Sequence, residues 1–245
     1  MNALSLLTFN IECSQYQTRH EKINQLLEFM KYKSFDCLCL QDVNLTSLSI
    51  LKSKLNNYNV IEALNNQKSK TSQIIMLSNS ITILEEYSYD IPSLENKEIL
   101  GCKILWNEKE VEIINVHLED ESSSYRGKQV DIIYEITAEN NNYVIVGDFN
   151  IVSMEEEASV MLLKNKKFTD SWINDGCVSC LRNTTFVESN KMDKVDKVDK
   201  LDKLDKLDKW ARTTRLLYVK SCLDCKCTGL INFNSNKSMV TFSVL

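Results

Sequence analysis

This chain is poor in the residues that build flexible connections. It contains one proline and five glycines among 245 residues, which argues against long disordered linkers. Hydrophobic residues make up 43% of the chain, so a sizeable core is available. The length is large for one domain but suits a sandwich of two sheets. We therefore expect a single domain over residues 1–245.

The chain also lacks a strong charge of either sign. Its formal net charge of −5 excludes the uniformly basic surface of a protein that envelops nucleic acid. A partner rich in phosphate would need a bound cation, or local lysine and arginine residues, to offset its charge.

No segment has the length and hydrophobicity of a signal peptide or a membrane span. The apolar run at residues 4–9 is too short for either role. Nine cysteines, an odd number, occur without a signal peptide, which indicates reduced thiols in a reducing compartment. We expect an intracellular monomer of the nucleus or cytoplasm with no membrane partner.

Two cysteine pairs have the short spacing of half a zinc site, Cys177 with Cys180 and Cys222 with Cys225. The stretch between the pairs is longer than in ordinary zinc ribbons and contains a repeat. Unrelated free thiols are therefore the favoured interpretation, and structural zinc the weaker one.

That repeat is a low-complexity insert at residues 192–209, where Asp-Lys occurs six times at a spacing of three. As a helix it gains charge pairs four residues apart, such as Asp193 with Lys197. A spacing of three falls short of the helical period, so the apolar residues wind around the helix and form no single core face. We predict an exposed, marginal helix inserted in a loop; a substrate or partner contact is the alternative.

The clearest strand is residues 143–146, a run of β-branched and aromatic residues typical of a strand buried on both faces. It ends at Gly147, Asp148, Phe149 and Asn150. Asp148 could take a proton from water or bind a metal, and Asn150 could hold a phosphate oxygen. The alternative is a strand end with a simple Asx turn.

Other predicted strands also end on polar residues. Residues 4–10 end on Asn10, residues 37–41 are followed by Asp42, and residues 111–117 end on His117. Strands at 74–77, 81–84, 99–106 and 111–117 form an expected antiparallel series, and helices are expected at 20–31, 45–55, 124–138 and from Met154. Strands that alternate first with helices and then with one another predict two sheets flanked by helices.

The ordered set of strand ends resembles the endonuclease/exonuclease/phosphatase superfamily of metal-dependent phosphodiesterases. The matching stretches are Leu7-Thr8-Phe9-Asn10, Leu40-Gln41-Asp42-Val43, Asn115-Val116-His117-Leu118-Glu119, Val146-Gly147-Asp148-Phe149-Asn150, and the pair Arg126 and Gln129. The resemblance implies an α/β fold, a four-layered sandwich of two mixed sheets packed face to face and flanked by helices.

Within the superfamily, the chain looks most like the tyrosyl-DNA phosphodiesterases that act on 5′ DNA ends. The triplets that carry this likeness are His117-Leu118-Glu119, Asp170-Ser171-Trp172 and Thr184-Thr185-Phe186. Relatives that cleave abasic DNA, shorten RNA tails or hydrolyse phosphoinositides share most of the motifs. The implied partner is a DNA or RNA end.

The resemblance also implies roles for single residues. Asp42 would hold Mg²⁺, or Mn²⁺, with help from Asn10, although the family usually has Glu in place of this Asp. Asp148 would orient and deprotonate the attacking water. Asn150 and His117 would bind non-bridging phosphate oxygens. Asn10, Arg126 and Trp172 complete the expected substrate contacts.

The C-terminal part departs from the family pattern. The family ends on Ser-Asp-His, with an orienting Asp upstream, whereas this chain has Ser235-Asn236-Lys237 and Thr214. A lysine can still supply positive charge, but as a mobile ammonium without a fixed partner. We favour a weakened enzyme in which Lys237 replaces the His. The alternatives are a member that binds nucleic-acid ends without turnover, and a phosphatase of lipids or inositol phosphates.

Overall fold

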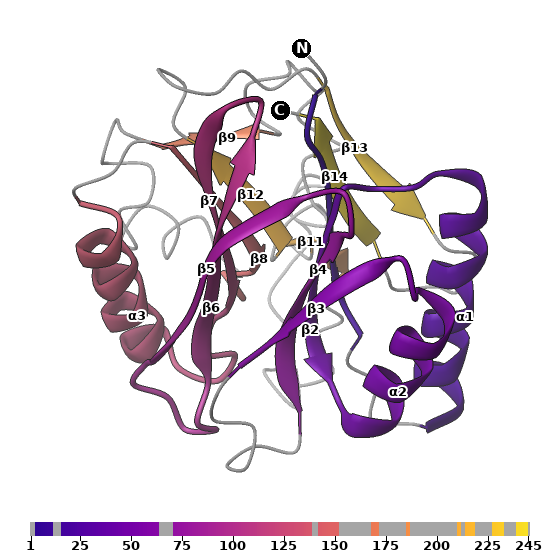
Figure 1. Ribbon diagram of the computed structural model, residues 1–245. Coiled ribbons are helices and arrows are strands. Elements are labelled where there is room, and N and C mark those ends of the chain that lie inside the picture. The colour runs from indigo at the N-terminus through magenta and orange to yellow at the C-terminus, as the bar shows by residue number, and fades with distance from the viewer. Residues whose placement is uncertain are drawn as a thin grey trace, which may run out of the picture.

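Figure 1 shows the computed structural model of the chain. It describes residues 3–11, 16–63, 71–138, 142–151, 168–171, 185–186, 210–211, 214–218, 227–232 and 239–244. The Asp-Lys repeat, the helix predicted from Met154 and both cysteine pairs lie outside these residues. Within the described part, no helix is long and apolar enough to cross a bilayer.

The first sheet has six strands in the order β13-β14-β1-β2-β4-β3. Among the described strands of this sheet, β1 and β2 are parallel neighbours, and the other neighbouring pairs are antiparallel. The bounds are Ser5–Asn10 (β1), Cys37–Val43 (β2), Tyr58–Glu62 (β3), Ser72–Ser78 (β4), Cys227–Asn232 (β13) and Met239–Val244 (β14).

The second sheet also has six strands, in the order β5-β6-β7-β8-β12-β9. Here β7 and β8 are the parallel pair. The bounds are Thr82–Asp90 (β5), Glu98–Trp106 (β6), Lys109–His117 (β7), Tyr143–Asp148 (β8), Thr169–Asp170 (β9) and Thr214–Tyr218 (β12). A separate short pair joins β10 (Thr185–Phe186) to β11 (Trp210–Ala211).

Three helices cover the outer faces of the two sheets in the described part of the chain, as Figure 1 shows. Helices α1 (Tyr16–Tyr32) and α2 (Leu45–Lys54) lie on the first sheet, and α3 (Ser123–Ile136) lies on the second. Asn44 caps α2 by accepting a hydrogen bond from the backbone N–H of Ser47 at 2.8 Å. The four-layered arrangement of two mixed sheets and flanking helices is confirmed.

Each interface between layers is filled by its own apolar cluster. Inward side chains of both sheets, such as Leu6, Cys39 and Ile113, form the central cluster. The outer face of the first sheet packs on α1 and α2, and the outer face of the second packs on α3. This packing follows from period-2 alternation in the strands and helical spacing in the helices.

One prediction about strand order was wrong. The strand at 74–77 does not belong to the antiparallel series with 81–84, because β4 pairs with β2 and β3 in the first sheet. The chain then crosses to the second sheet, where β5, β6 and β7 are consecutive antiparallel neighbours. The short turn at Asn79 looks like a hairpin in sequence, but Ile81 follows it into the central cluster between the sheets.

Candidate active site

The two parallel strand pairs bring the polar strand ends to one edge of the sandwich. Asn10 lies at the end of β1, beside Gln41 on β2. His117 lies at the end of β7, directly beside Asp148 at the end of β8. Parallel neighbours end at the same edge of a sheet, where α/β proteins commonly bind ligands.

Asp148 is the centre of a small hydrogen-bonded group. Its Oδ2 accepts a hydrogen bond from Nδ2 of Asn10 at 3.1 Å, and its Oδ1 accepts one from the backbone N–H of Asn150 at 3.2 Å. The bond from Asn10 crosses from the first sheet to the second. Asp148 is 6% exposed, so these donors fix the orientation of a nearly buried carboxylate.

Gly147 allows β7 and β8 to come close just before Asp148. Its φ of 142° is unfavourable for other residues, and a Cβ atom there would lie 2.0 Å from the carbonyl oxygen of Val116. Asn150 also has a positive φ, 50°, and its Nδ2 donates to the carbonyl oxygen of Leu118 at 2.9 Å. The end of β8 therefore adopts backbone conformations that glycine and asparagine tolerate better than other residues.

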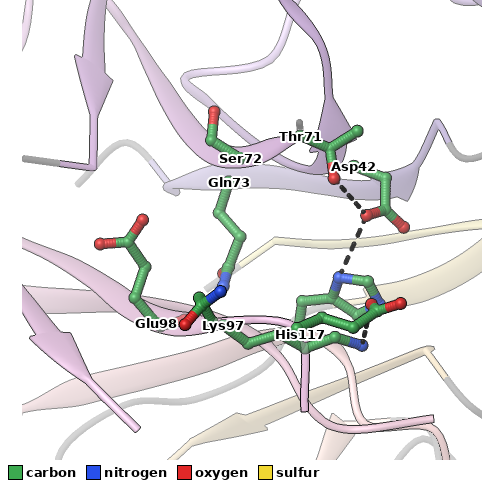
Figure 2. A pocket seen from close by; sticks show the side chains of 9 residues that line it. Asp42, Thr71, Ser72, Gln73, Lys97, Glu98 and His117 are labelled. Carbon is green, nitrogen blue, oxygen red and sulfur yellow. Dashed lines mark hydrogen bonds and ion pairs between the residues drawn. The ribbon is translucent and has the colours of Figure 1, made fainter. Parts of the chain in front are cut away.

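Asp42 and His117 form the second half of the site. Oδ1 of Asp42 lies 3.5 Å from Nδ1 of His117 and accepts a hydrogen bond from Oγ1 of Thr71 at 3.1 Å. Figure 2 shows the two side chains pointing toward each other from different sheets. Asp42 has a φ of 56° and lies in a bulge of β2, where the register to β4 shifts between Leu40 and Val43.

A polar pocket opens beside this pair. Its volume is about 30 Å³, enough for a water molecule or an ion, and its walls come from β2, the start of β4 and the turn before β6 (Figure 2). The lining residues are Asp42, Thr71, Ser72, Gln73, Glu95, Asn96, Lys97, Glu98 and His117.

Asp42 has the chemistry of a metal ligand. Among the described residues, its Oδ2 is buried and has no hydrogen-bond partner. A buried carboxylate oxygen left unpaired is costly, and a hard cation would satisfy it. The described residues contain no group of three or more His, Cys, Asp and Glu that could enclose an ion. They do fit Mg²⁺, which is usually held by one or two carboxylates together with water and substrate phosphate.

Lys97 is a site residue that the sequence analysis missed. Its side chain is only 7% exposed, and its Nζ donates to the carbonyl oxygen of Leu118 at 3.1 Å and lies 3.5 Å from Asp120. Partial burial raises the pKa of Asp120, but the nearby Lys97 ammonium and hydrogen bonds with Glu119 and the backbone together lower it overall. Lys97 and Asn150 thus share one carbonyl acceptor directly after His117. A lone lysine in a short loop gives no sequence signal for such a role.

Arg126, another predicted site residue, binds the backbone. Arg126 is 4% exposed and its Nη1 donates to the backbone oxygens of Glu119 at 2.7 Å and Asp120 at 2.9 Å. It holds the loop after β7 and does not line the pocket, so a substrate contact by Arg126 stays a prediction. Trp172 and Lys237 lie outside the described residues.

The fold matches that of solved endonuclease/exonuclease/phosphatase structures. D. rerio TDP2, solved with a single-stranded DNA product, matches with a TM-score of 0.78 at 18% identity, over 99% of this chain and 98% of that one. C. elegans TDP2 matches with a TM-score of 0.72 at 16% identity, over 99% of this chain and 75% of that one.

Bacterial proteins share the fold as well. A Bacteroides thetaiotaomicron mannosyl-6-phosphatase matches with a TM-score of 0.70 at 13% identity, over 99% of both chains. No protein-family model and no curated protein matches the sequence. The resemblance inferred from the strand-end motifs is therefore confirmed as a likeness of fold.

Proposed function

We propose that this protein is a divalent-metal-dependent phosphodiesterase that acts on nucleic-acid ends, with 5′-tyrosyl adducts as the first substrate to test. The observation that carries the proposal is the convergence of two pairs at one edge: Asn10 with Asp148 at 3.1 Å, and Asp42 with His117 at 3.5 Å. Each pair joins the two sheets, so the four side chains form one site. The DNA product held by D. rerio TDP2 supports the choice of substrate.

Asp148 would act as the base that orients and deprotonates the attacking water. Its two donors, Asn10 and the N–H of Asn150, hold the carboxylate in one orientation, and such positioning is a large part of catalysis. Asp42 would hold Mg²⁺ or Mn²⁺, and the ion would supply positive charge to the phosphate and the leaving oxygen. His117 would contact a non-bridging phosphate oxygen.

The charge of the pocket argues against substrates with many phosphates. Among the described residues, three carboxylates, Asp42, Glu95 and Glu98, line it together with one ammonium, that of Lys97. That ammonium is already close to Asp120 and Glu95, at 3.5 and 3.8 Å. An inositol polyphosphate carries more negative charge than a single phosphodiester, so these carboxylates would repel it more strongly.

The expected rate is below that of a complete family member. Thr214 pairs directly with Asp148 between β12 and β8, which supports our alignment of Thr214 with the orienting Asp of the family. Without that Asp and its His partner, a transition-state donor is missing. Loss of one such donor costs about 10²- to 10³-fold in rate. We therefore propose slow turnover, with Lys237 as the substitute charge.

The test is cleavage of a 5′-phosphotyrosyl oligonucleotide in the presence of Mg²⁺. Asp148→Asn should lower kcat by about 10²- to 10⁴-fold, because the amide cannot accept the proton of the water. Asp131→Asn is the matched control, since Asp131 is exposed on α3. No cleavage by the wild type, or equal cleavage by Asp148→Asn, would refute the proposal.

Two other outcomes identify the alternatives. Nucleic-acid binding that needs no Mg²⁺ and survives Asp42→Ala would identify a binding protein without turnover. Cleavage of small phosphate monoesters but not of oligonucleotides would identify a phosphatase, the class of the Bacteroides neighbour.

A further inference from the structure

A layer of fully buried polar side chains lies directly beneath the site. It consists of Thr8 on β1, Gln41 on β2 and Asn115 on β7, each 0% exposed, and we name it the amide layer. Gln41 directly precedes Asp42, and Asn115 lies two residues before His117. Each member of the amide layer therefore sits one or two residues from a site residue on its own strand.

Within the amide layer, hydrogen bonds connect the two sheets. Nε2 of Gln41 donates to Oδ1 of Asn115 at 2.7 Å and also reaches Oγ1 of Thr8 at 3.0 Å. Nδ2 of Asn115 donates back to the carbonyl oxygens of Leu40 at 3.1 Å and Ile74 at 3.0 Å. Asn115 thus contacts both strands of the β2–β4 pair from the opposite sheet.

These contacts fall at the bulge that directs Asp42. Leu40 pairs with Ile74 and Val43 pairs with Ser72, so two residues of β2, Gln41 and Asp42, oppose one residue of β4. The paired residues Leu40 and Ile74 are the last before the bulge, and their carbonyl oxygens are the ones that accept from Asn115. A bulge redirects a side chain, and Asp42 here has the left-handed φ of 56°.

We propose that Asn115, through Gln41 and the bulge, is the positioning residue that holds the Asp42 carboxylate opposite His117. Apolar packing between the sheets is non-directional and does not by itself fix the 3.5 Å separation of two side chains from different sheets. A fully buried amide with three partners supplies that direction. The role of Asp42 and His117 in catalysis rests on the function proposed above, whereas the role of Asn115 in positioning them does not.

The experiment compares Asn115→Leu with Thr8→Val in the full chain. Asn115→Leu has similar volume and removes every cross-sheet bond of the layer. Thr8→Val is the matched control, because it removes a buried bond that stays within the first sheet. Both variants are examined by crystallography, by thermal unfolding, and by kcat and KM on the phosphotyrosyl oligonucleotide.

We expect Asn115→Leu to move Asp42 and His117 apart, beyond the ion-pair range of about 4 Å. Its kcat should fall by about 10²-fold with little change in KM, since misplacement of a catalytic group by about 1 Å has this effect. Thr8→Val should lower Tm but leave both the separation and kcat unchanged. An unchanged separation in Asn115→Leu, or an equal loss of kcat in Thr8→Val, would overturn the proposal.

Gln41→Met covers the case in which Asn115→Leu does not fold. It removes the 2.7 Å bond to Asn115 and leaves the bonds of Asn115 to the bulge. It should increase the separation of Asp42 and His117 by less than Asn115→Leu does. An unchanged separation would overturn the proposal. If the wild type showed no turnover, the phosphodiesterase function would be refuted. The positioning role of Asn115 would still be tested, because the crystallographic comparison of the variants needs no activity.

Discussion

In strands β1, β2 and β7, the residues that point into the space between the two sheets differ in chemistry from one end of the strand to the other. At one end the inward residues are apolar, such as Leu6, Cys39 and Ile113 in the central cluster. Further along the same strands, at the same alternate positions, stand Gln41 and Asn115. The apolar end supplies free energy of burial, and the polar end supplies direction, because hydrogen bonds are directional whereas the hydrophobic effect is not.

The largest effect should come from Gly147→Ala, which disturbs the boundary between the two ends. A Cβ atom 2.0 Å from the Val116 carbonyl oxygen, at a φ of 142°, must push β7 and β8 apart. We expect an exceptional loss of unfolding free energy, above about 4 kcal/mol, in urea titrations. Activity should be lost as well, because Asp148 is the next residue.

Gly127→Ala is the control for that change. Gly127 lies in α3 and a Cβ atom there has no neighbour within 4 Å. Helix propensity predicts a gain of up to about 1 kcal/mol. Equal stability of the two variants would show that the close approach of β7 and β8 is unimportant.

At the apolar end, Ile113→Ala should cost about 2–5 kcal/mol of unfolding free energy, because Ile113 is 0% exposed in the central cluster. The kcat of the folded fraction should stay near the wild-type value. This residue is two positions before Asn115 on the same strand, so the pair of variants sharpens the contrast directly. If Ile113→Ala lost as much kcat as Asn115→Leu, the apolar and polar ends of the strand would not differ in their effect on catalysis.

At the polar end, Lys97→Met should have a small and pH-dependent effect. Burial raises the pKa of Asp120, but the ammonium and several hydrogen bonds together hold it below its ordinary value. The stabilisation from the ammonium is therefore present above that value and is lost as pH falls through the folded pKa. With the bond to Leu118 also lost, we expect about 0.5–1.5 kcal/mol of destabilisation at pH 7. The difference from wild type should shrink below about pH 4, near the ordinary pKa of Asp. Urea unfolding at pH 7 and pH 3 measures it, and a constant difference would contradict this account.

The sequence predicted those parts of the fold that local patterns determine. The strand ending at Asp148 and the helices α2 and α3 were found because alternation and helical spacing are local. The convergence of Asn10 on Asp148 followed from the order of the strand ends and the family resemblance, and the 3.1 Å bond confirms it. The strand at 74–77 is assigned to the wrong series because its partner β2 is distant in sequence, and such pairing leaves no local pattern.

The sequence does not predict the contacts made by several residues in or beneath the site. Asn115 belongs to the strand-end motif, but its contact with Gln41 connects strands from different sheets. Lys97 lies in a turn without periodicity. Arg126 donates to the backbone oxygen of Glu119, a partner that the motif match does not predict, and its contact with substrate stays a prediction. A motif match predicts roughly where a residue lies in the fold, but it does not predict the hydrogen-bond partner of its side chain.

The place of β1 in the first sheet has a consequence for folding during synthesis. β1 pairs on one side with β2, which emerges soon after it, and on the other side with β14, the last described strand. Until the ribosome has released β14, one edge of β1 stays open to the pairing of foreign strands. Such long-range closure slows folding, so a nascent chain stalled before β14 should depend on chaperones more than the finished protein.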